Sequence, residues 1–322
     1  MKVTPENLYK KIFDYCNKKG LIKKLKKSFI LGEEKDYNKL DISSNGLSLL
    51  DAVHCVYDKR RTMFFLDEVK KYVKSDSVVL EAGVGTGILS FFASSRSPWV
   101  YGFEINPTIF TFANKVKNYL SDKKVFFSKP PVFQLKDATK VQVPESVDVL
   151  ISENIYTGMF FEQQVQIMNN TLSCLKKDGV VIPHKLEFFI ILSQIDLPKK
   201  VRNKDIFIPS SERKIHFETK PLSKPVSYEL LDFKKQSALG TKKKLSIPIT
   251  CTGKINSLII YNEVIMPSGV VIGRTDTTFL NNDIIIAIRP SLKVKRGDII
   301  NLHLAYSYGS NPKDAKFSLK KK

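Results

Sequence analysis

The chain has 322 residues, of which 43% are hydrophobic and 26% charged, as in ordinary globular proteins. This composition excludes an intrinsically disordered chain, and no apolar run reaches the roughly 18 residues that a membrane-spanning helix needs. The first residues lack the apolar segment of a secretory signal, which predicts a cytoplasmic protein. The length fits two domains, or one large domain with an appendage, and we expect two cores.

The formal net charge is +20, from 52 basic and 32 acidic residues. Its sign predicts attraction to nucleic acid, acidic protein or anionic lipid, although a lysine-rich proteome would explain it equally well. The four cysteines and four histidines are scattered, without the paired spacing of a metal site. We therefore expect reduced cysteines and no metal cofactor.

Apolar positions recur at helical spacing over the first 30 residues, which predicts one or two amphipathic helices separated at Gly20. The segment from Leu47 to Tyr72 also has helical character. From Ser77 onward, short buried strands alternate with helices, as in a parallel sheet with crossover helices. The expected strands are 77–80, 99–103, 125–127, 147–152 and 179–182, and the expected helices are 88–93, 107–120 and 162–175.

Beyond Pro183 the helical periodicity nearly disappears. Short β-rich stretches at 186–192, 257–261, 270–272, 284–288 and 299–305 are separated by turn signals. We therefore expect an α/β, Rossmann-like domain over 49–183, preceded by a helical segment over 1–48. A β-barrel or β-sandwich over 184–322 would bind the substrate or form an oligomer. We expect a long loop or protruding excursion at 198–225 and a frayed tail at 317–322.

Three alternate glycines lie between the first expected strand and the helix after it, in Glu81-Ala82-Gly83-Val84-Gly85-Thr86-Gly87. A backbone without β-carbons can turn sharply there and approach a ligand closely. Dinucleotide-binding folds use a related glycine pattern. The acidic residue before the glycines and the GxGxG spacing favour the cationic methionine portion of S-adenosylmethionine over a pyrophosphate. We predict that Glu81, Gly83, Gly85, Thr86 and Gly87 contribute to a site for this cofactor.

Two more carboxylates occupy positions where an α/β fold binds ligands. Glu104 ends the next expected strand, about twenty residues after the glycines, and can accept hydrogen bonds from both ribose hydroxyls. The alternative is that Glu104 only caps the helix that begins at Pro107. Asp137, which precedes the strand at 147, can accept a hydrogen bond from the adenine amino group.

The segment Ser152-Glu153-Asn154-Ile155-Tyr156-Thr157-Gly158-Met159-Phe160-Phe161-Glu162 resembles the double-E loop of the protein arginine methyltransferase family, in which two glutamates stand nine positions apart. The stretch Asp58-Lys59-Arg60-Arg61-Thr62 resembles the family's Asp-x-x-Arg-Thr, and 175–183 is similar to its exit into a β-barrel. The resemblance implies that Arg61 pairs with the cofactor carboxylate. It also implies that Glu153 and Glu162 clamp the guanidinium of a protein substrate by charge-assisted hydrogen bonds.

The chain departs from the family at several points. The family's Tyr-Phe-x-x-Tyr segment has no clear counterpart before Asp58, and its Thr-His-Trp loop falls near Thr277-Thr278-Phe279, without the histidine. Asn154, Ile155 and Tyr156 replace the family's Trp and Gly-Tyr after the first glutamate.

Other functions stay open at this point. Taken alone, Glu162 also fits an acidic residue that favours the start of a helix. The basic charge favours an RNA methyltransferase of the same fold as the main alternative. However, the sequence lacks the Asn/Asp-Pro-Pro-aromatic motif of enzymes that methylate base amines, and has Ser152-Glu153-Asn154-Ile155 at that place. A second alternative is a non-catalytic relative that binds partners through its β-rich part. A homodimer is a further expectation.

Overall fold

The computed structural model describes residues 3–30, 48–142, 146–197, 201–207, 218–278 and 282–322. Four helices precede the first strand: α1 (Pro5–Lys18), α2 (Leu21–Ile30), α3 (Leu49–Tyr57) and α4 (Lys59–Tyr72). Gly20 separates α1 from α2 as predicted, with a φ of +70° that glycine adopts without steric cost. Residues 31–47 of the expected helical segment lie outside the described residues.

The helix expected over 47–72 is two helices, because Asp58 ends α3 and starts α4. Its carboxylate accepts a hydrogen bond of 3.0 Å from the Arg61 amide, which satisfies a backbone donor in the first turn of α4. This cap fixes the direction of α4 and therefore the position of Arg61.

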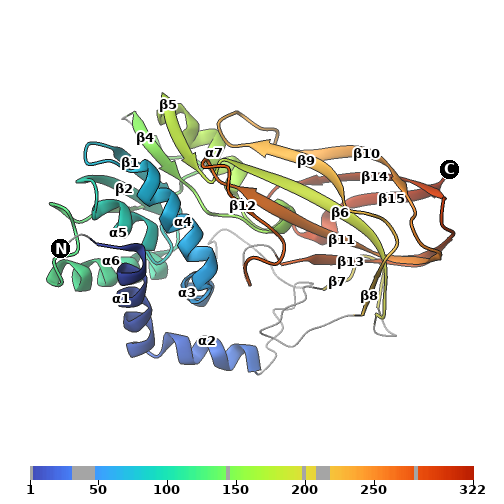
Figure 1. The fold of residues 1–322 in the computed structure, drawn as a ribbon, viewed down its shortest axis with the longest axis horizontal. Helices are drawn as coiled ribbons and strands as arrows, with labels where there is room; N and C mark the ends of the chain where they lie inside the picture. Colours follow the sequence, from blue (N-terminus) through green and yellow to red (C-terminus); the bar gives the residue numbers. More distant parts are fainter. Residues whose placement is uncertain (1–2, 31–47, 143–145, 198–200, 208–217, 279–281) are drawn as a thin grey trace.

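A five-stranded parallel sheet follows, in the order β3-β2-β1-β4-β5 (Figure 1). Its strands are β1 (Val78–Ala82), β2 (Trp99–Glu104), β3 (Val132–Leu135), β4 (Val147–Ile151) and β5 (Leu175–Ile182). Its connections contain α5 (Ile88–Ser94), α6 (Pro107–Asp122), η1 (Thr157–Met159), α7 (Gln164–Thr171) and η2 (Leu172–Cys174). The strand order reverses between β1 and β4, and open α/β sheets bind ligands at the carboxyl ends beside such a switch point.

The strand expected at 125–127 was wrong, because β3 begins only at Val132. Val125 is buried and the Phe126 ring lies 6.0 Å from the Phe91 ring of α5, so this apolar stretch packs across α5 without pairing in the sheet. Tertiary packing here overrides the β-propensity of the sequence.

The second half of the chain is β-rich, as predicted, and forms two antiparallel sheets. One has the order β7-β13-β11-β6-β8, with β9 paired to β6 and β12 to β11, and the other is β10-β14-β15. The strands are β6 (Lys185–Ile195), β7 (Ile206–Phe207), β8 (Thr219–Pro221), β9 (Val226–Asp232), β10 (Gly240–Pro248), β11 (Gly253–Ile265), β12 (Val271–Ile272), β13 (Ile284–Val294), β14 (Ile299–Ser307) and β15 (Lys316–Lys321), with the short helix η3 (Pro312–Asp314) before β15.

Two expectations about this half need correction. The stretch 198–225 is not entirely loop, because its described residues include the short strands β7 and β8, which pair with β13 and β6. The tail at 317–322 is not frayed, because β15 pairs with β14 from Lys316 to Lys321. Leu319 is partly buried against the core, which gives this strand an inner face.

The two halves do not have separate cores. Buried apolar side chains form one continuous cluster from α1 to Ala315, with a small second cluster around Ile191 and Ile259. At the junction, the Phe160 ring stacks on the Tyr306 ring with 4.5 Å between centroids. The loop after β4 therefore packs directly on the antiparallel part of the molecule.

Candidate functional site

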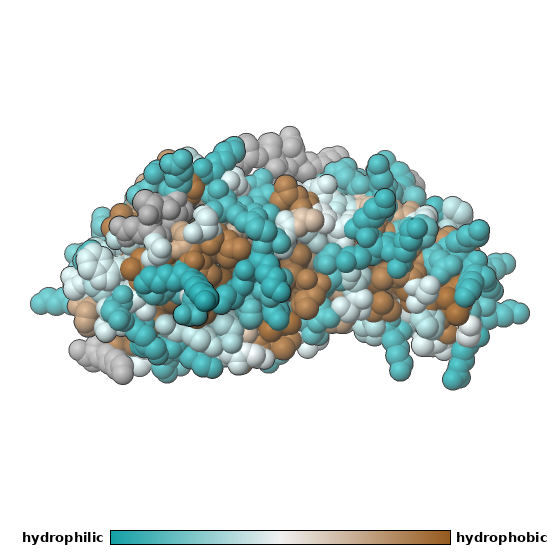
Figure 2. Space-filling view, turned by 90° about the horizontal axis from the view of Figure 1, so that it is seen from above, coloured by the Kyte–Doolittle hydropathy of each residue, from teal (hydrophilic) through white to brown (hydrophobic). Residues whose placement is uncertain are grey.

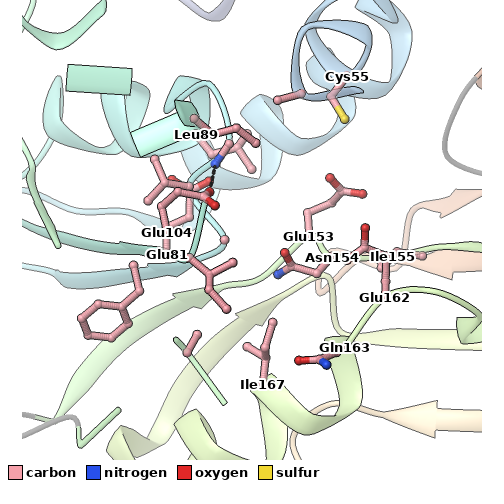
Figure 3. Close-up of a pocket in the computed structure, with 18 of the residues that line it drawn as sticks. Cys55, Glu81, Leu89, Glu104, Glu153, Asn154, Ile155, Glu162, Gln163 and Ile167 are labelled. Atoms are coloured by element: carbon pink, nitrogen blue, oxygen red, sulfur yellow. Dashed lines mark hydrogen bonds between the residues drawn. The ribbon is translucent and has the colours of Figure 1, made fainter. Parts of the chain in front are cut away.

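A pocket of about 170 Å³ opens at the carboxyl ends of β1, β2 and β4, beside the switch point (Figure 3). Every predicted site residue except Gly87 lines it: Arg61, Glu81, Gly83, Gly85, Thr86, Glu104, Asp137, Glu153 and Glu162. Gly87 lies at the start of α5, where a β-carbon would meet the Phe91 ring at 2.5 Å. A glycine at this position therefore leaves room for the Phe91 ring of α5.

The glycine turn has left-handed backbone at each of its glycines, with φ of +86° at Gly83 and +57° at Gly85. A β-carbon on Gly83 would collide with the side chain of Asn154, whereas a β-carbon on Gly85 would meet nothing within 4 Å. The Asn154 side chain also donates a hydrogen bond of 2.7 Å to the Ala82 carbonyl. Asn154 thus joins the loop after β4 to the glycine turn, while Gly85 leaves space open for a ligand.

Glu104 is buried at the end of β2 and accepts hydrogen bonds from the amides of Gly85, at 3.0 Å, and Asn106, at 2.9 Å. Figure 3 marks a hydrogen bond to its carboxylate. Burial raises the pKa of Glu104, while these backbone donors oppose the shift. The side chain of Asn106, not that of Glu104, caps α6 by accepting from the Thr108 amide at 2.9 Å. The helix-cap alternative therefore does not explain Glu104.

Glu81 is buried below the glycine turn, and its carboxylate accepts hydrogen bonds from the amide and the hydroxyl of Ser90 on α5. Burial raises its pKa to about 8, although the bonds from Ser90 favour the charged form. This carboxylate lines the pocket but is directed at α5, so it ties the turn to the helix.

Arg61 and Glu153 form an ion pair in which the side chains are only 5% and 10% exposed. The guanidinium also lies 5.4 Å from the centre of the Phe65 ring, and its Nη1 atom is 3.5 Å from the Cys55 carbonyl. In Figure 3, Glu153 points towards the helix that carries Cys55. Arg61, which was expected to bind the cofactor carboxylate, therefore contacts Glu153, which was expected to bind the substrate guanidinium.

Gln164, which the sequence reasoning missed, is fully buried at the start of α7 and fixes the double-E loop. Its amide oxygen accepts from the Ser152 hydroxyl at 2.9 Å and the Asn154 amide at 3.0 Å, and its amide nitrogen donates to the Ser152 carbonyl at 2.7 Å. These bonds hold the backbone on both sides of Glu153. The helix expected from 162 begins at Gln164, so Glu162 lies just before it.

The backbone before Glu162 has unusual geometry. Met159 and Phe161 have φ of +56° and +66°, values that cost on the order of 1–3 kcal/mol each for such side chains. The turn after β14 holds them: the Gly309 amide donates to the Met159 carbonyl at 2.8 Å, and the Phe161 amide donates to the Ser310 carbonyl at 3.0 Å. Gly309 itself lines the pocket. No signal in the sequence connects this distant turn to the site.

Asp137 lies at the rim of the pocket, and its carboxylate accepts hydrogen bonds from the Thr139 amide, at 2.9 Å, and the Thr139 hydroxyl, at 2.7 Å. Burial acts to raise the pKa of Asp137, but these bonds and the Lys140 ammonium outweigh it and lower the pKa. Asp137 is therefore an ionised acceptor beside the pocket.

The family's Thr-His-Trp loop has its expected counterpart at 277–279, of which Phe279 lies outside the described residues. The Thr278 amide donates a hydrogen bond of 2.7 Å to the Asp58 carboxylate, the same group that caps α4. The β-rich half thus contacts the helix start that carries Arg61.

In the described ranges, no three His, Cys, Asp or Glu side chains are grouped to hold a metal ion. No helix in those ranges is both long and apolar enough to cross a bilayer. The cytoplasmic location stays a prediction.

The architecture is a Rossmann-like parallel sheet followed by antiparallel sheets, and it recurs in solved structures. The Trypanosoma brucei protein arginine methyltransferase 1 enzyme–prozyme complex with AdoHcy matches with a TM-score of 0.66 and 17% identity, over 84% of this chain and 92% of that one. Arabidopsis thaliana protein arginine methyltransferase 10 matches with a TM-score of 0.60 and 13% identity, over 84% of this chain and 96% of that one.

Sequence comparison points to the same family. An uncharacterised protein of Methanocaldococcus jannaschii is 25% identical over 81% of this chain and 93% of its own length. Human protein arginine N-methyltransferase 2 is 32% identical over 41% of this chain, but the match spans only 30% of the human protein. No protein-family model matches. The chain thus resembles protein arginine methyltransferases in both fold and sequence.

Proposed function

We propose that the protein is an S-adenosylmethionine-dependent methyltransferase that modifies arginine side chains of a protein substrate. The observation that carries this proposal is that Arg61, the glycine turn, Glu104 and both glutamates of the double-E loop line one pocket. The resemblance to protein arginine methyltransferases supports it. The structure of one such relative is a complex with AdoHcy, the demethylated form of the cofactor.

The pocket suits this cofactor. Beside Gly85 the space is open, and the carboxylate of Glu104 lies next to it, where it would accept hydrogen bonds from ribose hydroxyls. Arg61 would hold the cofactor carboxylate, and Asp137 would accept from the adenine amino group. Gly83 and Thr86 would border the methionyl portion, whereas Glu81 and Gly87 would act by shaping the turn.

When bound, S-adenosylmethionine supplies a methyl group on a positively charged sulfur. Glu153 and Glu162 would hold the guanidinium so that one nitrogen faces that methyl group, which lowers the entropic part of the barrier. The Glu162 carboxylate would accept the proton that the nitrogen loses on methylation. The buried walls of the pocket would exclude water, which strengthens these charged hydrogen bonds.

The test is incubation of the full chain with radiolabelled S-adenosylmethionine and separate pools of protein and RNA. Label in arginine of the protein pool is the expected result. Glu162→Gln should lower turnover by about 100-fold or more while cofactor affinity stays within a few-fold, because only the acceptor loses its counter-charge. Glu6→Gln, on the exposed face of α1, is the matched control and should leave turnover unchanged.

Each other outcome contradicts part of the proposal. Full activity of Glu162→Gln would refute the arginine assignment but not cofactor binding. Label confined to the RNA pool would favour an RNA methyltransferase of the same fold, which the net charge of +20 and the replacement at Asn154 support. Absence of cofactor binding in calorimetry would favour a non-catalytic binding protein.

A further inference from the structure

The sheet β10-β14-β15 has an outward face that is strongly basic. Side chains alternate between two faces along a strand, so every second residue points outward. The basic residues at the exposed outward positions are Lys242 and Lys244 of β10, His303 of β14, and Lys316 and Lys320 of β15. The outward positions of these three strands contain no Asp or Glu. We name the four lysines together the basic face.

Two lysines at the other positions of these strands are neutralised by carboxylates outside the three strands. Lys243, between Lys242 and Lys244, contacts the Glu229 carboxylate at 3.1 Å, and Lys321 contacts Asp298 at 2.6 Å. In the described part of the chain, none of the four lysines of the basic face forms an ion pair. Positive charge is thus compensated on one side of this sheet and left uncompensated on the other.

The strand register sets the spacing of these charges. Lys242 and Lys316 both pair with Ala305 of β14, one from each side, so they lie about 10 Å apart across two strand intervals. Lys242 and Lys244 are about 7 Å apart along β10. Between the two lysine-bearing strands lies a hollow of about 240 Å³, whose lining includes Ala305 and Ser318. Lys242, Lys244 and Lys316 line this shallow channel, together with His303, Leu304 and Phe317.

The chemistry of this channel favours a phosphate backbone over a protein or a bilayer. Protein interfaces are depleted in lysine and rich in Phe, Tyr and Trp, whereas the outward positions of these strands hold none of these three residues. Membrane-surface elements present large apolar side chains to the acyl boundary, and Ile299, at one end of β14, is the only large apolar residue among these positions. A chain with a pI of about 9.6 and lysines clustered on one face has the electrostatic character of a nucleic-acid-binding protein.

We propose that the basic face binds the phosphate backbone of a nucleic acid without reading its sequence. Because no Phe, Tyr or Trp points outward to stack on bases, contacts to phosphates dominate, and binding is salt-dependent and insensitive to base composition. Figure 1 places these strands at the end of the molecule opposite the N-terminus, and hydrophilic side chains project from that end in Figure 2. Ala305 lies near the end of β14, and Gly309 of the pocket lies four residues later in the turn that follows this strand.

This inference goes beyond the methyltransferase proposal and does not depend on it, because the four lysines do not line the catalytic pocket. The experiment measures binding of fluorescein-labelled 20-nucleotide single-stranded RNAs, one of uridine and one of adenosine, to the full chain by anisotropy over a salt series. The face variant replaces Lys242, Lys244, Lys316 and Lys320 by Gln. The control variant replaces four exposed helical lysines, Lys18, Lys23, Lys24 and Lys27, by Gln and changes the net charge equally.

We expect similar affinity for the two RNAs. The slope of log K against log salt should become shallower by about two to three in the face variant, because each phosphate that a lysine neutralises contributes ~0.7 to the slope. Affinity near 0.1 M salt should fall on the order of 100-fold in the face variant and only a few-fold in the control. A variant with Arg at all four positions should keep the affinity, which would show that the missing charge and not altered folding causes the effect.

Equal loss of affinity in the face and control variants would overturn the proposal, because net charge alone would then explain binding. So would absence of RNA binding by the unmodified protein. Polyglutamate or phosphatidylserine vesicles that displace the RNA better than unlabelled RNA, at equal charge concentration, would reassign the face to an acidic protein or a membrane.

Discussion

Removal of the Glu153 charge should destabilise the protein, because Glu153 forms a buried ion pair with Arg61. Glu153→Gln keeps the shape of the side chain but leaves the Arg61 guanidinium charged and only 5% exposed. The hydrogen bond from its Nη1 atom to the Cys55 carbonyl is long, at 3.5 Å, and its Nε atom has no hydrogen-bond partner among the residues that the structure describes. An unpaired buried charge of this kind costs about 3–5 kcal/mol. We expect a loss of this size in the free energy of unfolding of the ligand-free protein, measured by chemical denaturation.

A double variant and a ligand complete this test. Arg61→Met with Glu153→Gln removes both charges and should recover much of the lost stability, because no charge is then buried alone. If the cofactor carboxylate reaches Arg61, S-adenosylhomocysteine should raise the melting temperature of Glu153→Gln more than that of the unmodified protein. A single variant within about 1 kcal/mol of the unmodified protein, or a double variant no more stable than the single one, would refute the argument.

Three further predictions concern the cofactor half of the pocket. Glu104→Ala should weaken S-adenosylmethionine binding in calorimetry by about 1.5–3 kcal/mol, through loss of hydrogen bonds to a charged group, and unchanged affinity in a folded variant would remove Glu104 from the site. Because burial raises the pKa of Glu81 from 4.5 to about 8, the native state holds a proton that the unfolded state releases. The free energy of unfolding should therefore fall as pH rises from 4.5 to about 8, by up to about 1.4 kcal/mol per unit, and Glu81→Gln should flatten that dependence in denaturation experiments. Gly83→Ala should lower the melting temperature more than Gly85→Ala, because only the first collides with Asn154, and the reverse order would contradict the geometry.

Local sequence signals predicted the residues that lie at the ends of neighbouring strands. Glu81, Glu104 and Glu153 each end or follow a strand of the parallel sheet, and parallel strands bring their carboxyl ends to one edge. The glycine turn between β1 and α5 was recognisable because its backbone needs φ values that other residues avoid. The division of the chain at 48 and 183 stays a prediction, although β5 ends at Ile182 and β6 begins at Lys185.

What the sequence could not predict depends on contacts between distant segments. The turn at Gly309 borders the pocket and contacts the double-E loop through two hydrogen bonds between backbone groups. Since every residue type offers a backbone carbonyl, and nearly every type a backbone amide, the sequence gives no sign of these bonds. Gln164 is a polar residue at a helix start, where a solvated position is the ordinary expectation, yet it is fully buried. The strand expected at 125–127 failed because Val125 is buried and the Phe126 ring packs against Phe91 of α5, without pairing in the sheet.

The departure from the family at Asn154 has a structural consequence. Its side chain hydrogen-bonds to the Ala82 carbonyl and fills the space beside Gly83, while its amide is held by Gln164. The residue after the first glutamate therefore forms a wall shared by the glycine turn and the double-E loop. Because the Asn154 side chain fills the space beside Gly83, a bulkier residue such as tryptophan at this position would press against the glycine turn.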